Sequence, residues 1–202
     1  MKTARTLLLL AALLVAVPTF AACGDDGTDE ATAISAESGQ DQEHSEAETE
    51  GIYVDVDGIK YQAQTSKQLN PQIALDKDYL EGVTGPQLQL GPDEVWFAVL
   101  MRAENDEGKP GTRTADRFVI EDSQGGRYEP LKLANSNNFA YRSFELGEGE
   151  VYPDPESTPG ERPPYGALLL FKLKRESLGN RPLELHIESG ETDQVATVNL
   201  DV

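Results

Sequence analysis

The most apolar run outside the N-terminal leader, residues 95–102 (VWFAVLMR), constrains the fold more than any other stretch. It is short, rich in strand-forming residues, and bounded by Pro92 and by the polar residues 105–108. A short apolar run with these boundaries is typical of a fully buried strand. A buried strand needs packing partners, so we expect this one at the centre of a sheet in a layered β fold.

Short segments with strand character recur along the rest of the chain. Asp57-Gly58, within the alternating segment 54–61, predicts a tight hairpin, and a Gly-Gly turn predicts a second hairpin between 117–121 and 127–131. Residues 73–80 fit either one helical turn or an irregular loop. The remaining strand candidates are residues 166–173, 183–188 and 195–202.

About eight short strands separated by Gly and Pro turns predict an all-β fold, an immunoglobulin-like β-sandwich. The chain contains one cysteine, so the sandwich would lack the usual disulfide between its sheets. Its core would be packed instead around Trp96, Phe97, Phe118 and Phe171.

Residues 1–22 are expected to be a lipoprotein signal peptide. Lys2 and Arg5 precede eleven apolar residues (7–17), which would span roughly 16 Å as a helix, about half of a bilayer core. That length fits the apolar part of a secretory signal and is too short for a transmembrane anchor. Small residues then lead to Cys23.

Cys23 is predicted to be the first residue of the mature protein and the site of lipid attachment. The stretch before it resembles a bacterial lipobox, with Phe20 where leucine is usual. The alternative is an ordinary signal peptide cut near Ala22, which would leave an unpaired thiol exposed to oxidation. Two or more acyl chains, such as palmitate, would hold Cys23 stably on the membrane. We therefore expect an exported lipoprotein on the outer face of the cell membrane.

Residues 23–50 are predicted to form a disordered, acidic linker. Of residues 24–50, ten are Asp or Glu, none is Lys or Arg, and Ile34 is the only bulky apolar side chain. Such a segment buries too little apolar surface to offset its loss of conformational entropy. As a random coil it would reach roughly 30 Å and lift the domain off the membrane. His44 lies in this linker and is expected to be solvated.

Residues 51–202 are long enough for one domain with a sizeable core. In this range 15 Lys or Arg against 26 Asp or Glu leave a net charge of −11. Phosphate backbones would be repelled by such a domain, which excludes nucleic acid as a partner.

Five prolines interrupt residues 152–166, so this stretch is predicted to be a long surface loop rather than part of a sheet interior, and its role stays open.

Tyrosines recur in or near the predicted loops. They either contact a protein or glycan partner or simply cap the edge of the sandwich, and capping is the plainer interpretation. These residues are Tyr128, Tyr141, Tyr152 and Tyr165.

The sequence contains no recognisable catalytic set. A Ser-His-Asp arrangement needs a base held by buried partners, whereas alternation places His186 on the solvent side of its strand with Glu184 and Glu188. Residues two apart on a strand are separated by about 6.8 Å, too far for one tight metal site. We therefore expect no enzyme activity, no resident metal and no cofactor.

Three motifs resemble a known family. They are the strand 95–102, the pattern F-x-I-x-D-S-x-G-G-x-Y-x-P at 118–130, and G-x-L-x-L-F-x-L at 166–173. Together they resemble the telokin-like immunoglobulin-fold domains of secreted proteins and lipoproteins from Gram-positive bacteria and actinobacteria, which are similar in fold to immunoprotective secreted antigens of mycobacteria. The resemblance covers roughly residues 51–200. It implies an extracytoplasmic β-sandwich and no catalytic residues.

These observations predict a membrane-tethered, non-enzymatic binding module. The lipid on Cys23 would anchor the chain, residues 23–50 would act as a stalk, and residues 51–202 would engage an envelope or surface protein. The alternative is an extracytoplasmic carrier of a metal or small ligand, with carboxylates and His186 as ligands.

Overall fold

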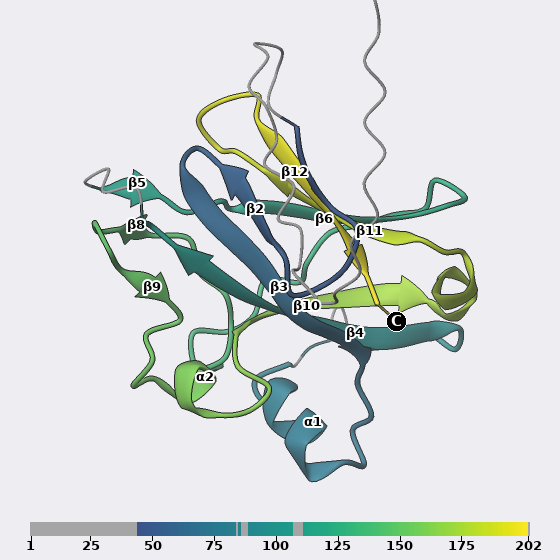
Figure 1. Ribbon diagram of the computed structural model, residues 1–202. Helices are drawn as coiled ribbons and strands as arrows, with labels where there is room; N and C mark the ends of the chain where they lie inside the picture. Colours follow the sequence, from purple (N-terminus) through teal and green to yellow (C-terminus); the bar gives the residue numbers. More distant parts are fainter. Residues whose placement is uncertain (1–43, 84, 86–88, 107–110, 202) are drawn as a thin grey trace, which may run out of the picture. The chain divides into compact units, whose positions relative to one another are not determined.

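The computed structural model of the chain describes residues 44–83, 85, 89–106 and 111–201. They form a mostly β fold of two larger sheets, one small sheet and few short helices (Figure 1). The prediction of a β-rich fold is therefore confirmed. The first sheet contains, in spatial order, β1 (Ser45–Ala47), β12 (Val195–Leu200), β11 (Leu183–Glu188), β6 (Arg117–Asp122) and β7 (Arg127–Tyr128).

The second sheet is built on the long strand β4 (Glu94–Glu104), which contains the apolar run 95–102. β4 pairs in antiparallel register with β10 (Ala167–Lys174) on one side and with β3 (Ile59–Gln68) on the other. β3 in turn pairs with β2 (Tyr53–Val56), and the short β9 (Val151–Tyr152) pairs with the end of β4.

The remaining elements are short. β5 (Thr112–Arg113) and β8 (Glu145–Leu146) form a separate two-stranded sheet. The helical segments are α1 (Ala74–Tyr79), α2 (Thr158–Glu161) and a 3₁₀ turn, η2 (Arg175–Gly179). Residues 73–80 thus contain the helical turn that was one of their two predicted conformations.

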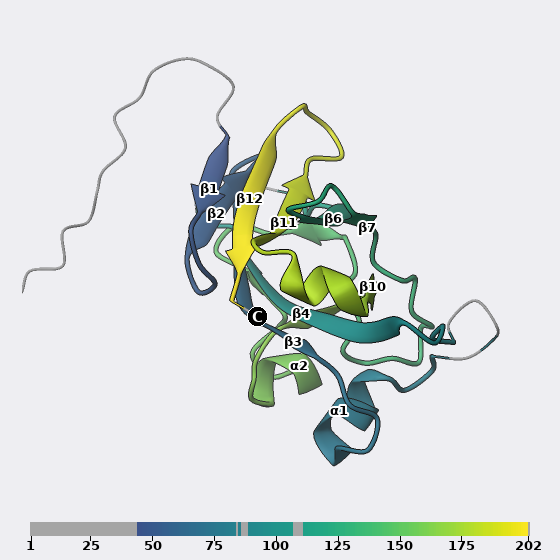
Figure 2. The ribbon, with the colours of Figure 1, turned by 90° about the vertical axis from the view of Figure 1, so that its right-hand side faces the viewer.

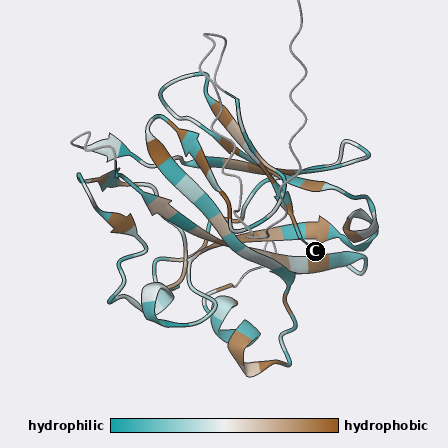
Figure 3. Cartoon of the chain, in the orientation of Figure 1, coloured by the Kyte–Doolittle hydropathy of each residue, from teal (hydrophilic) through white to brown (hydrophobic). Residues whose placement is uncertain are grey.

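The two larger sheets bury a common core. Hydrophobic and hydrophilic residues alternate along several strands (Figure 3), and the inward residues of both sheets meet in one cluster. Phe97 and Phe171 are directly paired across β4 and β10 in this cluster, and Phe118 joins it from β6. Alternation along a strand places every second side chain on the same face, which explains the pattern.

β4 and β10 are buried on both faces, which accounts for their nearly continuous apolar sequence. Trp96, predicted to share the core with the phenylalanines, faces the opposite way and is buried in a second cluster. This cluster lies between the outer face of the two strands and the residues around α1 and the segment 131–140. Its other buried members are Leu69, Tyr79, Ala98, Leu100, Leu133, Phe139, Ala140, Leu168 and Leu170.

The Asp57-Gly58 turn joins β2 to β3 as predicted. Both residues have positive φ (57° and 77°), the combination that tight hairpin turns require. The Asp57 carboxylate accepts hydrogen bonds from the Ser189 and Thr192 hydroxyls, and its backbone N–H donates to Gln194 Oε1. The turn therefore also holds the connection between β11 and β12.

Residues 44–50 were predicted to be part of the disordered linker, and for this stretch the structure requires a correction. Ser45–Ala47 form β1, which pairs in parallel with β12 through Ser45↔Ala196 and Ala47↔Val198 (Figure 2). Glu50 accepts hydrogen bonds from the backbone N–H groups of Ser66 and Asp201. The polar composition of this stretch hid a strand whose partner lies about 150 residues further along the chain.

Candidate functional site

The proline-rich loop leaves the second sheet at β9 and returns to it at β10. Its fold is tight because two glycines allow close backbone contact. A Cβ on Gly160 would lie 2.0 Å from the carbonyl oxygen of Asp154, and one on Gly166 would lie 2.9 Å from the backbone of Leu100. Gly166 N–H also donates to the Pro159 carbonyl. The loop is therefore a packed surface element, as its prolines predicted.

Two hollows are lined by this loop, and a third adjoins the first of them. The largest, here called the groove, has a volume of about 970 Å³ and lies between residues 135–146 and 150–159. The small pocket, about 220 Å³, includes Arg102 and Tyr165 and shares Val151, Pro153 and Pro155 with the groove.

The third hollow, the edge pocket, has a volume of about 390 Å³ and shares Ala140 and Arg142 with the groove. Its walls also include Phe118, Leu131 and Leu169. Segments 140–142 and 151–155 are therefore walls between neighbouring hollows. The three together make an extended surface rather than one closed cavity.

An unbroken row of aromatic rings connects the floor of the groove to the main core. Phe118, 3% exposed, packs edge-on against Tyr141, which packs against Tyr152, which packs against Phe144. The centroid separations are 4.9, 5.3 and 4.9 Å, in the range favourable for such pairs. Phe144 is 36% exposed at the groove end of the row. The groove thus has a rigid aromatic floor.

Hydrogen bonds fix the tyrosines of this row. Tyr141 Oη donates to the Ala115 carbonyl at 3.0 Å, and the Ala115 N–H donates to Tyr61 Oη at 2.6 Å. Burial raises the pKa of Tyr61 and of Tyr141 well above the usual range, so both phenols stay neutral. Tyr152 Oη accepts from the Arg142 N–H. These hydrogen bonds hold the floor in place.

The four tyrosines singled out in the sequence behave differently from one another. Tyr128, Tyr141 and Tyr152 pack against the main core, which agrees with the capping interpretation. Tyr165 is 51% exposed and lines the small pocket. Only Tyr165 therefore presents its ring freely to solvent.

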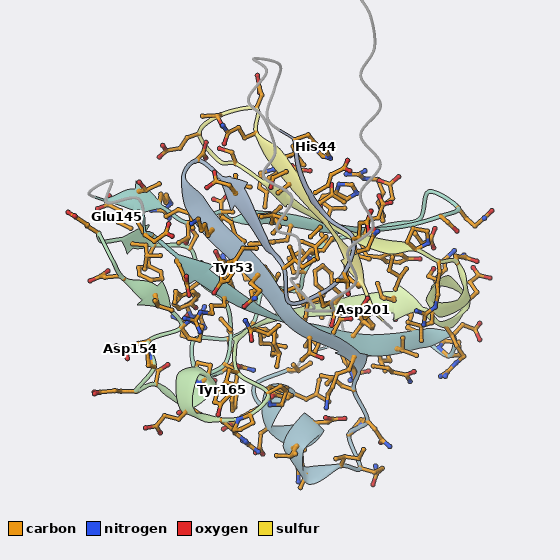
Figure 4. The ribbon with its side chains drawn as sticks, in the orientation of Figure 1. His44, Tyr53, Glu145, Asp154, Tyr165 and Asp201 are labelled. Atoms are coloured by element: carbon orange, nitrogen blue, oxygen red, sulfur yellow. The ribbon has the colours of Figure 1, made fainter. Side chains whose placement is uncertain are left out.

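The acidic segment, residues 143–161, forms one side of the groove. It contains six carboxylates and no Lys or Arg. Figure 4 shows two of them, Glu145 in β8 and Asp154 in the loop before α2, at the margin of the domain. Three carboxylates line the groove itself: Glu150, Asp154 and Glu156.

Among the described residues, Arg142 is the one Lys or Arg that lines the groove. Its guanidinium Nη2 donates to the Ala134 carbonyl at 2.9 Å, so it braces the opposite wall. The nearest cation after the segment, Arg162, pairs with Asp78 at 2.7 Å and lies 5.5 Å from the Phe139 ring. Both guanidinium groups are thus engaged with residues outside the acidic segment.

The two histidines, which the sequence places 142 positions apart, meet on the outer face of the first sheet. His44 Nε2 and His186 Nδ1 each lie 3.3 Å from the Thr197 hydroxyl oxygen. Glu46 lies 3.1 Å from His44, and Glu184 lies 3.7 Å from His186. Sequence reasoning missed this pair because His44 was assigned to the linker.

Within the described part of the chain, no three side chains among His, Cys, Asp and Glu gather closely enough to hold a metal ion. Glu188, the third member of the predicted surface row, pairs with Arg117 at 2.8 Å instead. Two members of the predicted row, His186 and Glu188, therefore contact the neighbouring strands β12 and β6.

Cys23, the predicted lipidation site, lies outside the described residues, as do the signal peptide 1–22 and most of the predicted linker. In the described ranges, no helix combines the length and apolar character needed to cross a membrane. Compared with protein-family models, with curated proteins and with solved structures, the chain gives no match.

Proposed function

We propose that this protein is a lipid-anchored, extracytoplasmic interaction module without enzyme activity. Cys23 would carry the lipid, and the β domain would bind an envelope or surface protein through the groove and its two neighbouring hollows. The observation that carries the proposal is the groove of about 970 Å³ with its aromatic floor. Exposed aromatic rings held on a rigid base are typical of binding surfaces.

An immunoglobulin-like sandwich is part of this proposal. The order β12, β11, β6 corresponds to strands G, F and C of an immunoglobulin domain, with β7 in the position of C′. The order β10, β4, β3 corresponds to E, B and A. These correspondences support the likeness to the telokin-like domains, and such domains present their loops at the ends of the sandwich for binding.

Photo-crosslinking in intact cells tests the binding surface. A crosslinking residue is placed in the full chain at Phe144, on the groove floor, or at Glu191, in the exposed connection between β11 and β12. We expect an adduct of one defined mass from position 144 and none from position 191. Equal adducts from both positions, or none from either, would contradict an interaction module that uses the groove.

The anchor is tested separately, by intact mass and membrane fractionation of the wild type beside Cys23→Ala. We expect the wild type in the membrane fraction, beginning at Cys23 and carrying acyl mass, and the variant in the soluble fraction. Soluble, unmodified protein in both cases would overturn the lipoprotein proposal and leave the binding surface to be judged by crosslinking.

A second candidate function is transport of a small apolar ligand. The edge pocket favours it, because a volume of about 390 Å³ falls within the roughly 300–1,000 Å³ common for small-molecule sites. A ligand that binds the folded protein and not the unfolded chain raises the melting temperature. Stabilisation by an apolar small molecule that Leu169→Trp abolishes would favour the carrier over the interaction module.

A further inference from the structure

We propose that the groove binds an extended, basic peptide segment of the partner protein. This inference rests on the proposed function, because it names the chemistry of the partner at the same surface. It is carried by two properties of the groove that occur together: an apolar floor and an uncompensated negative charge on one wall.

The floor is apolar and preorganised. Phe144, Leu146, Val151 and Tyr152 contribute side chains, and Pro153 and Pro159 are buried below the wall. Because the aromatic row anchors Phe144 and Tyr152 to the core, little ordering is required when a ligand covers them. A flat apolar surface of this kind suits the hydrocarbon stems of long side chains.

The wall carries charge that the domain does not neutralise. No carboxylate of the acidic segment takes part in an ion pair with another described residue. Elsewhere in the described domain, carboxylates are regularly paired with cations. Those pairs are Asp76–Lys67, Asp78–Arg162, Glu94–Lys172, Glu104–Arg102, Asp106–Lys60, Glu121–Arg127 and Glu188–Arg117.

Two of the three groove carboxylates, those of Glu150 and Asp154, are also positioned by the backbone. Glu150 Oε2 accepts the Gly147 N–H at 2.7 Å, and Asp154 Oδ1 accepts the Glu156 N–H at 2.8 Å. One oxygen of each therefore has a fixed direction, and the charges stay close to the apolar floor. Glu150 and Asp154 therefore present placed acceptors rather than freely rotating side chains.

A basic peptide satisfies both properties at once. The stems of Lys or Arg side chains cover the proline and aromatic surface, their charged ends reach Glu150, Asp154 and Glu156, and a guanidinium can stack on Phe144. A neutral glycan would also use the aromatic floor, but it would gain nothing from the unpaired charge. The charge of the wall therefore favours the peptide.

The test measures binding of the purified full chain in detergent to two labelled peptides of about ten residues, one rich in Lys and Arg and one with Gln in their place. Fluorescence anisotropy gives Kd. We expect the basic peptide to bind at least about tenfold more tightly, because exposed ion pairs contribute a factor of about two to five each. The preference should shrink at 0.5 M salt because salt screens exposed charges.

Two triple variants decide whether the groove is responsible. The groove variant, Glu150→Gln, Asp154→Asn and Glu156→Gln, keeps the oxygens that accept the backbone hydrogen bonds while removing three charges. The control variant, Glu176→Gln, Glu191→Gln and Asp193→Asn, removes three exposed charges elsewhere. We expect the groove variant to weaken basic-peptide binding about tenfold and the control to change it less than twofold.

Each remaining outcome overturns the inference in a recognisable way. Equal weakening in both variants would show that the net charge alone attracts the peptide. A chitin-type oligosaccharide or the Gln peptide bound as tightly as the basic peptide, with affinity lost in Phe144→Ala, would show that the groove binds something else and leave the proposed function standing. Absence of binding to every probe, together with failed crosslinking at position 144, would remove both proposals.

Discussion

Carboxylates on the outer face of the first sheet are paired with cations, whereas the groove carboxylates of the acidic segment are not. On the sheet, Glu188 lies 2.8 Å from Arg117 and 3.9 Å from Arg127, and Arg127 also pairs with Glu121. Along residues 143–161 six carboxylates occur without a Lys or Arg. Strand register places residues of neighbouring strands side by side, so opposite charges there stabilise the sheet. In the acidic segment Glu145 lies opposite Arg113 across β8 and β5. The groove carboxylates Glu150, Asp154 and Glu156 form no ion pair with a described residue, so their charge remains available to another molecule.

The largest predicted change in stability concerns the aromatic row, because this row connects the buried core to the groove beside the acidic segment. Phe118→Ala should lower the free energy of unfolding by about 3–5 kcal/mol, since it leaves a cavity under Tyr141. Phe144→Ala, at the exposed end of the same row, should cost less than about 1.5 kcal/mol. Urea denaturation measures both. Similar losses in the two variants would mean that the groove floor belongs to the folding core.

Substitution of Asp122 should have an intermediate effect on the free energy of unfolding, and this effect should depend on pH. Burial opposes its charged form, but hydrogen bonds from Ser177, Asn180 and the backbone of Gly126 and Gln124 outweigh burial and lower the pKa of Asp122. Because the folded pKa is depressed, its stabilising contribution is complete above the unfolded value of about 3.9 and is lost as pH falls through the folded pKa.

Asp122→Asn should therefore cost about 1–3 kcal/mol at pH 7 and flatten the loss of stability between about pH 4 and pH 2. Urea midpoints measured across this pH range give the result. The matched control is Asp154→Asn, in the acidic segment, where we expect almost no change at either end of the range. An unchanged acid slope in Asp122→Asn would refute the role assigned to its hydrogen bonds.

The smallest predicted effect is a difference in the sign of the stability change between two Glu→Gln variants. Glu188→Gln should destabilise the domain by about 0.5–1 kcal/mol, because Arg117 and Arg127 lose their common partner. Glu156→Gln should leave stability unchanged or raise it by a few tenths of a kcal/mol, because it relieves repulsion among carboxylates. Calorimetric melting at low salt resolves the two. Destabilisation by Glu156→Gln would mean that the acidic segment is compensated after all.

Local features of the chain could be predicted because their causes lie within a few residues. The positive φ values of Asp57-Gly58 follow from the turn chemistry of those two residues, and the apolar runs of β4 and β10 follow from burial on both faces. The proline-rich loop was expected at the surface and is found there. Trp96 was correctly placed in the interior, but the face it occupies depends on register, which single-strand patterns do not define.

The groove could not be predicted, because its two walls come from segments that the sequence treats as unrelated loops. Asn135 and Asn138 line the groove together with the acidic segment because β10 and the 131–141 segment run side by side, held by hydrogen bonds such as Leu131 N–H to Leu170 C=O. The excess of carboxylates in 143–161 was visible in the sequence. The sequence did not show whether cations elsewhere in the chain would neutralise these carboxylates.

The sequence by itself determined the longer buried strands, the Asp57-Gly58 turn and how much negative charge the chain carries, since propensity, burial pattern and composition act locally. Tertiary structure alone decided that Ser45–Ala47 joins β12, that His44 and His186 meet at Thr197, and that the acidic segment faces an aromatic floor. The physical reason is that pairing across long separations depends on which sheet edge and which apolar surface another part of the chain leaves open.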